Sequence, residues 1–156
     1  MYVDPGDRFP TIDEAAIDLL EYAARETAEN DGIRKRERGG DIKVDEETGE
    51  FYYDNIDVGT NDSIDVGIGD RTVAIAHTHP PSEGEGRGLA DWRNDRTNNG
   101  NISRQDRRQV REANRHLGRQ IPTYVGTADG TVTRFDAETN YRVGVEIAPD
   151  GTLSFR

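Results

Sequence analysis

Apolar and polar positions alternate along the first part of the chain with the spacing of an amphipathic helix. The inner stripe consists of residues spaced three or four apart, namely Ile12, Ala16, Leu19, Ala23 and Thr27. Thr11, followed three residues later by Glu14, is typical of a capping box. We therefore predict a helix that begins at Thr11 and runs to about Asn30.

Most of the remaining hydrophobic pattern is that of strands. Residues 37–44 and 50–56 flank a turn at residues 45–49 and predict a hairpin. An apolar run begins at Thr72 and is stopped by Pro80, because proline has no N–H group for a sheet ladder. Further strands are expected at residues 122–127, 131–135, 141–147 and 152–155, with Asp129-Gly130 and Asp150-Gly151 in the turns.

A second amphipathic helix is predicted from Ser103 to Leu117, with Asn101 or Ser103 as its N-cap. Its apolar residues, Val110, Ala113 and Leu117, form one stripe at helical spacing. The same stripe, continued towards the N-terminus by four and then three residues, reaches Asp106 and Ser103. The face that packs into the core is thus expected to carry a carboxylate and a hydroxyl group.

These elements predict a single α+β domain in which a mixed sheet lies between two main helices. A chain of 156 residues is long enough to bury a core of that size. We assign residues 11–156 to this domain, and residues 1–10 to a leader or to the end of a parent polypeptide.

Candidate chemistry gathers at the end of the strand that starts at Thr72. His77 and His79 are two residues apart, so in a strand both imidazoles project from the same side. Two neutral imidazoles side by side can hold a divalent metal such as zinc, with a pair of surface histidines as the alternative. Asp106 offers a third ligand, because a buried carboxylate needs a partner that offsets its desolvation. In the alternative, Asp106 only favours the positive end of its helix.

A further acid precedes the predicted hairpin. Glu37 lies in a charged run, residues 34–38, where a glutamate is normally solvated. Gly39 and Gly40 follow it, and paired glycines inside a strand indicate close approach of another backbone or of a substrate. The start of this hairpin is therefore a second candidate part of the site.

Together these residues resemble the signature of the JAMM (MPN-plus) metalloproteases. The motif runs Glu37, then His77-x-His79-Pro80, then Ser103-x-x-Asp106, and the resemblance covers about residues 11 to 135. The alanine-rich first helix, the Glu-x-Gly-Gly hairpin and the His-Thr-His-Pro stretch are similar to JAMM-like domains at the C-termini of bacterial polymorphic (Rhs-type) toxins. The resemblance implies a cytidine-deaminase-like layered architecture, in agreement with the predicted elements.

The resemblance also implies a role for each residue of the motif. It makes His77, His79 and Asp106 the ligands of a zinc ion, with a water in the fourth position. Glu37 would take a proton from that water and return it to the leaving amine. Ser103 would donate a hydrogen bond to the oxyanion of the tetrahedral intermediate. The implied reaction is hydrolysis of an amide, which in this family is often an isopeptide bond to a lysine.

The chain departs from the family pattern between the two halves of the motif. Family members usually have a short spacer there, whereas 22 residues (81–102) intervene in this chain. We expect this insertion to be a long loop that gates or shapes a substrate cleft, with a solvated surface loop that tolerates deletion as the alternative. Trp92 of the insertion is a candidate substrate contact, together with Gly39 and Gly40 of the hairpin. The insertion also holds three rival metal ligands, Glu85, Asp91 and Asp95.

Composition narrows the classes of function. The formal net charge of −11 argues against a nucleic-acid partner held through its phosphates. The hydropathy shows neither a signal peptide nor a spanning segment, so no membrane partner is expected. A zinc deaminase is excluded because the chain has no cysteine. Metal phosphoesterases that open with H-x-H need further histidines, and only His116, expected near the solvent side of its helix, is left.

The sequence therefore favours a zinc-dependent peptidase or isopeptidase that acts on a protein or peptide as a bacterial toxin domain. Two alternatives stay open: an inactive MPN-like interaction module, and a metal hydrolase that acts on a non-peptide amide. As a toxin domain, the chain would be exported within a larger polypeptide and act in the target-cell cytoplasm. A cognate immunity protein would then be a further partner.

Overall fold

The computed structural model describes residues 7–81 and 102–155. Residues 82–101, which form most of the predicted insertion, lie outside the described residues, as do residues 1–6 of the predicted leader. The predictions for the insertion, and for five of its residues, therefore stay predictions. These residues are Glu85, Asp91, Trp92, Asp95 and Asn101.

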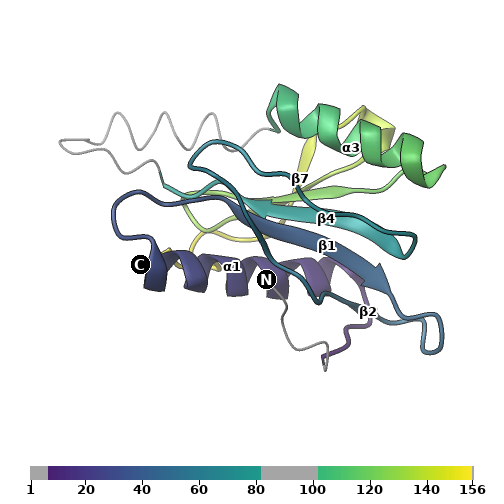
Figure 1. The fold of residues 1–156 in the computed structure, drawn as a ribbon, viewed down its shortest axis with the longest axis horizontal. Helices are drawn as coiled ribbons and strands as arrows, with labels where there is room; N and C mark the ends of the chain where they lie inside the picture. Colours follow the sequence, from purple (N-terminus) through teal and green to yellow (C-terminus); the bar gives the residue numbers. More distant parts are fainter. Residues whose placement is uncertain (1–6, 82–101, 156) are drawn as a thin grey trace.

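Two main helices and one mixed sheet make up the described chain (Figure 1). The helices are α1 (Ile12–Asn30), α3 (Arg104–Leu117) and a short 3-10 helix, η1 (Ala137–Thr139). The strands are β1 (Arg38–Val44), β2 (Phe51–Tyr52), β3 (Asp57–Val58), β4 (Thr72–Thr78), β5 (Thr123–Gly126), β6 (Val132–Phe135) and β7 (Gly144–Ala148). In Figure 1, α1 lies on one face of the sheet and α3 on the other, which confirms the predicted α+β class.

The order of the strands brings the two halves of the motif together. The sheet runs β2-β1-β4-β5-β6-β7, and β3 pairs with the beginning of β1. β4 and β5 are parallel, whereas the other described pairings are antiparallel. α3 follows β4 and precedes β5 in the chain, so it lies in the crossover between two parallel strands. Such a crossover leaves from the carboxyl end of β4, which is the end that carries the histidines.

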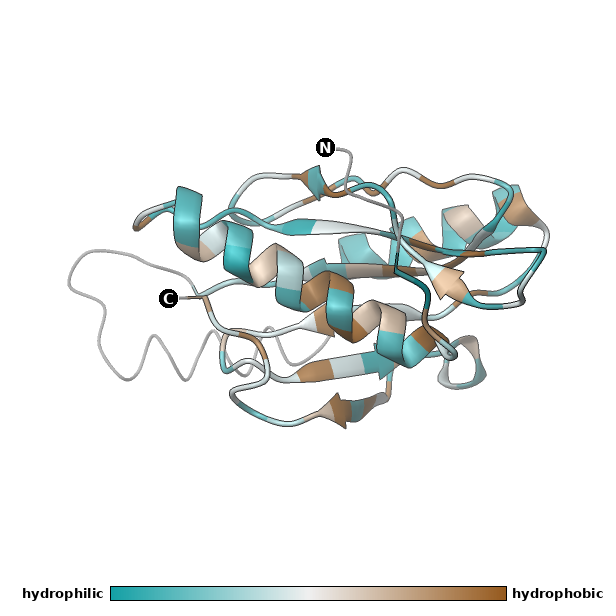
Figure 2. Cartoon of the chain, turned by 90° about the horizontal axis from the view of Figure 1, so that it is seen from below, coloured by the Kyte–Doolittle hydropathy of each residue, from teal (hydrophilic) through white to brown (hydrophobic). Residues whose placement is uncertain are grey.

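α1 packs on the sheet through a broad face of small and apolar residues. The buried residues are Ala15, Ala16, Leu19, Leu20, Ala23, Ala24 and Thr27, so the face is wider than the predicted stripe, and Ile12 is only half-buried. The helix begins at the predicted cap, because the Thr11 hydroxyl accepts a hydrogen bond from the Glu14 N–H group (3.1 Å). Figure 2, seen from the α1 side, shows hydrophilic and hydrophobic residues alternating along this helix. None of the described helices combines the length and the apolar content that a membrane crossing requires.

β4 presents alternate residues to the two helices. Ala74 and Ala76 belong to the cluster that α1 covers. Ile75 belongs instead to a second cluster, which includes Val110 of α3. His77 is two residues after Ile75, so its side chain projects on the α3 side of the sheet.

The predicted strand at residues 50–56 is wrong in its extent. Only β2 pairs with the end of β1, and pairing resumes at β3, which the sequence pattern did not predict. Gly39 and Lys43 of β1 are four residues apart. Their partners, Asp57 and Tyr52, are five residues apart, so the partner segment contains one extra residue. That extra residue makes a bulge, which interrupts the strand between β2 and β3.

The strands that follow α3 agree with the prediction in part. The hairpin at residues 122–127 and 131–135 is confirmed as β5 and β6. β6 then pairs with β7, which begins at Gly144 rather than at Tyr141. The reason is local, because Asn140 and Tyr141 have positive φ angles (57° and 59°), which an extended strand does not allow.

No strand forms at residues 152–155, contrary to the prediction. The Leu153 N–H group donates to the carbonyl group of Gly130, in the turn between β5 and β6 (3.0 Å). Leu153 and Phe155 are buried in the cluster that α1 covers. The alternating apolar pattern of this segment therefore reflects packing against the helix and the hairpin, and not membership of the sheet.

Candidate metal centre

Two histidine side chains meet at the carboxyl end of β4. The His79 N–H group donates to the Gly126 carbonyl (2.7 Å), which extends the pairing with β5 and fixes the backbone of His79. The Nε2 atoms of His77 and His79 are 3.1 Å apart, and the two residues are only 1% and 7% exposed. The predicted common side is confirmed, and the alternative of two surface histidines is wrong. The third histidine, His116, is exposed on α3, as predicted.

Asp106 reaches the same point from the first turn of α3. Ser103 is the N-cap, and its hydroxyl accepts a hydrogen bond from the Asp106 N–H group (3.1 Å). In return, the Ser103 N–H group donates to Asp106 Oδ2 (3.3 Å), so the two residues form a capping box. The same Oδ2 atom lies 3.1 Å from His79 Nε2 and 3.3 Å from His77 Nε2. Asp106 therefore both caps its helix and contacts the two imidazoles.

Opposing effects act on the ionisation of Asp106. Burial alone would raise the pKa of the carboxyl group. The imidazoles of His77 and His79 outweigh burial and hold that pKa well below its usual range. The cluster thus contains a buried, ionised carboxylate next to two nitrogen donors, which is a donor set that divalent metals bind.

The spacing of the three ligand atoms fits a tetrahedral metal. Bonds of about 2.0–2.1 Å at tetrahedral angles leave neighbouring ligand atoms about 3.3 Å apart. The separations among the two Nε2 atoms and Asp106 Oδ2 are 3.1, 3.1 and 3.3 Å. Protons cannot satisfy all three contacts, because each ring nitrogen either carries one proton or offers one lone pair. A cation bound by all three atoms would satisfy every contact at once.

Glu37 borders the cluster from the residue before β1. Its N–H group donates to the Thr60 carbonyl (2.7 Å), and its carbonyl accepts a hydrogen bond from the Gly59 N–H group (2.8 Å). One ligand atom from each of Glu37, His77 and His79 lies within 4.8 Å of the other two. Glu37 is only 5% exposed, so it is not the solvated glutamate that a charged run normally contains.

The carboxyl group of Glu37 is buried and incompletely hydrogen-bonded. Its Oε1 atom has no hydrogen-bond partner among the described residues. Burial raises its pKa from 4.5 to about 7; His79 opposes the rise, and the carboxylates of Asp106 and Asp62 add to it. A carboxyl group with a pKa near 7 can both take up and release a proton near neutral pH.

Ser103, Gly39 and Gly40 are the other described residues predicted for the site. The Ser103 hydroxyl oxygen accepts the capping hydrogen bond, which leaves the hydroxyl proton for a further acceptor. Gly39 has no room for a side chain, because a Cβ atom would lie 2.3 Å from the Ala76 carbonyl oxygen. At Gly40 a Cβ atom would lie equally close, at 2.3 Å, to the carbonyl oxygen of Asn55. The predicted approach of another backbone is confirmed, and contact of these glycines with substrate stays a prediction.

No family model matches the chain, and searches of the curated proteins and of the solved structures find no match either. The chemical interpretation therefore depends on the geometry of the cluster itself. That geometry is three ligand atoms within 3.3 Å of one another, with a buried acid beside them.

Sequence reasoning missed two residues that hold the cluster in position. Thr78 lies between the two histidines, and its Oγ1 atom accepts a hydrogen bond from the Arg38 N–H group (3.0 Å), which ties β4 to β1. Gln109 holds α3 against the segment before β4: its Oε1 accepts from the Val66 N–H group (2.8 Å) and its Nε2 donates to the Ile64 carbonyl (3.1 Å). In the sequence, the indication of this role was that Gln109 lies one helical turn after Asp106.

Proposed function

We propose that this chain is a zinc-dependent amide hydrolase, a peptidase or isopeptidase of the JAMM type. One observation carries the proposal: the ligand atoms of His77, His79 and Asp106 lie within 3.3 Å of one another. The buried carboxyl group of Glu37 stands beside them. A strand end, a helix start and the beginning of a hairpin strand supply these side chains, as the JAMM resemblance implies.

Two imidazole nitrogens and one carboxylate oxygen form a donor set that suits zinc. Three protein ligands leave the fourth tetrahedral position open, which is typical of catalytic and not of structural zinc. When bound, zinc would supply Lewis-acid chemistry, by lowering the pKa of a water molecule and polarising the carbonyl group of the substrate.

In this proposal Glu37 is the general base. Its Oε1 atom makes no hydrogen bond with the described residues, so it is available to accept a proton from the attacking water. In the metal-free protein, burial raises the pKa of Glu37 to about 7, so burial favours the protonated form that later returns a proton to the leaving amine. Backbone hydrogen bonds to Thr60 and Gly59 hold the base in position.

Ser103 is proposed to donate a hydrogen bond to the carbonyl oxygen of the substrate as that oxygen becomes negatively charged. The hydroxyl proton is free for this purpose, because the capping contact uses only the hydroxyl oxygen as an acceptor. The same residue holds Asp106 through the capping box. Ser103 thus supports both the ligand set and the proposed oxyanion contact.

The wider assignment follows the same resemblance. A mixed sheet between two helices, with β4 in its interior, agrees with a JAMM-like, cytidine-deaminase-like architecture. We extend the proposal to a bacterial toxin domain that acts on a protein or peptide, with a cognate immunity protein as its further partner.

An inactive interaction module is the main alternative. Such a module has no need of buried polar atoms without partners, which cost stability. Glu37 Oε1, beside the proposed ligands, is such an atom among the described residues. This observation favours a chemical role over a scaffold role. A hydrolase of non-peptide amides would use the same residues, so substrate trials decide between those two.

A peptide-library digest tests the proposal. Zinc-loaded protein should cleave peptide or isopeptide bonds, a chelator should stop the cleavage, and added zinc should restore it. Glu37→Gln keeps the size of the side chain but cannot accept a proton, so the rate should fall by roughly 10²–10⁴-fold with zinc content unchanged. Glu29→Gln, at an exposed position of α1, is the matched control.

Each outcome separates the candidates. Zinc-loaded protein that cleaves neither peptides nor small amides would contradict the hydrolase and favour the interaction module. Cleavage of small amides alone would favour the non-peptide hydrolase. A Glu37→Gln variant as active as the parent would remove Glu37 as the base.

A further inference from the structure

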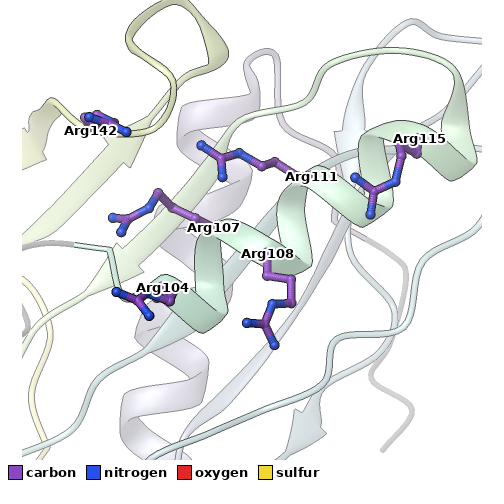
Figure 3. A pocket seen from close by; sticks show the side chains of 6 residues that line it. All are labelled: Arg104, Arg107, Arg108, Arg111, Arg115 and Arg142. Atoms are coloured by element: carbon purple, nitrogen blue, oxygen red, sulfur yellow. The ribbon is translucent and has the colours of Figure 1, made fainter.

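One strongly charged surface has no role in the proposed reaction. Six arginines line a pocket of about 530 Å³, and we call them the arginine surface: Arg104, Arg107, Arg108, Arg111, Arg115 and Arg142. Figure 3 shows the first five leaving the same helix, α3, with Arg142 on a neighbouring segment. Among the described residues only these arginines line the pocket, so no carboxylate of that part of the chain borders it.

The five arginines of α3 share one side of the helix. At about 100° per residue, they fall within an arc of about 100° of its circumference. The buried residues of α3, Asp106, Val110 and Ala113, lie on the other side. The arginine surface is therefore not part of the packing that holds α3 on the sheet.

These arginines have no carboxylate partner among the described residues. Arg107 donates to the Ile102 carbonyl (3.1 Å) and Arg111 donates to the side-chain oxygen of Asn140 (2.7 Å), and both acceptors are neutral. By contrast, Arg38 has a carboxylate oxygen at 2.6 Å. The described fold thus pairs a buried arginine closely but leaves the arginine surface without ion pairs.

The sequence makes this arrangement unusual. Arg104 and Arg108 are four residues apart, as are Arg107 and Arg111, and like charges at that spacing destabilise a helix. The chain has 31 acidic residues against 20 basic ones, so carboxylates that could pair with these arginines are abundant in the sequence. An external anionic ligand would explain why the arginines are gathered together without ion pairs to the described residues.

A carboxylate-rich protein segment fits the arginine surface better than a nucleic acid does. Within residues 7–81 and 102–155, no aromatic side chain lines the pocket, so this part of the chain offers bases no stacking platform there. The net charge of −11 repels a long polyphosphate beyond the pocket itself. From Arg104 to Arg115 the row is about 16 Å long, which matches about five residues of extended peptide. Guanidinium groups also bind carboxylates in a bidentate manner.

We propose that the arginine surface binds an acidic segment of the substrate, and that the enzyme prefers amide bonds next to such a segment. This inference rests on the proposed hydrolase function. Arg104 and Arg107 lie in the first turns of α3, at the helix end where Asp106 reaches the metal centre from the opposite side, so a segment bound along the helix and continued past its N-terminal end passes the metal centre. The substrate class is therefore an amide within a protein or peptide that carries carboxylates beside it.

Binding is measured first, on the whole chain with a chelator present, so that catalysis does not interfere. The probe is a short fluorescent peptide of alternating Glu and Gly, and its counterpart has Gln in place of Glu. The acidic peptide should bind about tenfold more tightly than the neutral one. The triple variant Arg104→Gln, Arg108→Gln, Arg115→Gln should lose that difference, while the contacts of Arg107 and Arg111 stay intact.

A second triple variant controls for net charge. Arg25→Gln, Arg34→Gln and Arg71→Gln remove three charges at exposed positions outside the arginine surface, and acidic-peptide binding should stay within about twofold of the parent. Equal binding by the parent and the first triple variant would overturn the inference. Tighter binding of a single-stranded oligonucleotide of the same charge than of the acidic peptide would overturn it as well.

Cleavage then separates this inference from the proposed function. The zinc-loaded parent should cleave a peptide with an acidic segment at about tenfold lower KM than its glutamine counterpart. The first triple variant should lose that preference and keep its kcat. If the arginine surface binds the acidic peptide but no peptide is cleaved, the hydrolase proposal fails and the binding surface stands. If the parent and the variant cleave both peptides with equal KM, the inference alone fails.

Discussion

Glu37 and Arg38 are neighbours in the chain, have an acidic and a basic side chain and are both buried, at 5% and 7% exposure. The guanidinium group of Arg38 donates to both carboxylate oxygens of Asp31 (2.6 and 2.8 Å) and to the Thr27 hydroxyl (2.7 Å). Glu37 Oε1, by contrast, has no partner among the described residues. Of these two adjacent buried side chains, Arg38 is therefore well hydrogen-bonded, whereas Glu37 has an oxygen without a partner among the described residues.

The two side chains differ in their hydrogen bonding because they extend to opposite faces of the sheet. Arg38 reaches the C-terminal end of α1, where its bidentate ion pair ties the helix to β1. Glu37 reaches the histidine cluster on the side of α3. A paired buried charge is explained by the fold it stabilises. An unpaired one costs stability, and the cost is explained if the group takes part in chemistry.

The largest expected change in stability comes from breaking the ion pair between Arg38 and Asp31. Asp31→Asn removes the charge that compensates buried Arg38, so the free energy of unfolding should fall by about 3–5 kcal/mol at pH 7. Burial raises the pKa of Asp31, but the hydrogen bonds from Arg38 and from the Arg36 N–H group outweigh it and lower the pKa. The pair therefore stabilises the protein above the ordinary pKa of 3.8, and its contribution is lost as the pH falls through the lowered pKa.

Urea denaturation measures this change. Glu46→Gln is the control, because Glu46 lies 3.7 Å from exposed Arg71 in a surface pair, and its removal should matter by less than about 0.5 kcal/mol. Equal small losses in the two variants would contradict the structural role assigned to the Arg38 pair.

A smaller change of opposite sign is expected at Glu37. Because burial raises its pKa from 4.5 to about 7, the metal-free folded protein keeps a proton that the unfolded chain has released. The free energy of unfolding should therefore fall as the pH rises from about 4.5 to about 7, by about 3 kcal/mol in total. Glu37→Gln cannot ionise, so it should lack this fall and be more stable than the parent at pH 8.

The measurement is urea denaturation of both proteins between pH 4 and pH 8 with a chelator present. The difference between the two profiles isolates Glu37 from the other groups that titrate in this range. Parallel profiles across the whole range would show that the carboxyl group is not held in its protonated form by burial.

The part of the site that depends on local periodicity could be predicted from the sequence. The two-residue period of a strand put His77 and His79 on one side, and they meet at 3.1 Å. The helical stripe through Val110 led back to Asp106, which is buried, and also to Ser103, which is exposed and caps the helix. The periodicity thus identified both residues, but Ser103 is not buried as its place on the stripe predicts, because it is the N-cap of the helix.

The rest depends on tertiary structure. Nothing local in the charged run at residues 34–38 distinguishes buried Glu37 and Arg38 from solvated residues, because their surroundings come from α1 and from residues 59–60. The bulge that creates β3 likewise appears only when β1 is paired. The arginine surface is different: its spacing along α3 was visible in the sequence, but a search for apolar stripes does not detect a stripe of charges.

Zinc content shows whether His77, His79 and Asp106 bind the metal. Protein prepared without added zinc is dialysed against zinc at pH 7, freed of excess metal and analysed by elemental mass spectrometry. We expect about one zinc per chain in the parent and in Glu37→Gln. The double variant His77→Ala, His79→Ala should bind none, and circular dichroism should show it to be folded, because these residues lie at a strand end. Full zinc occupancy in that folded double variant would show that the two histidines are not zinc ligands.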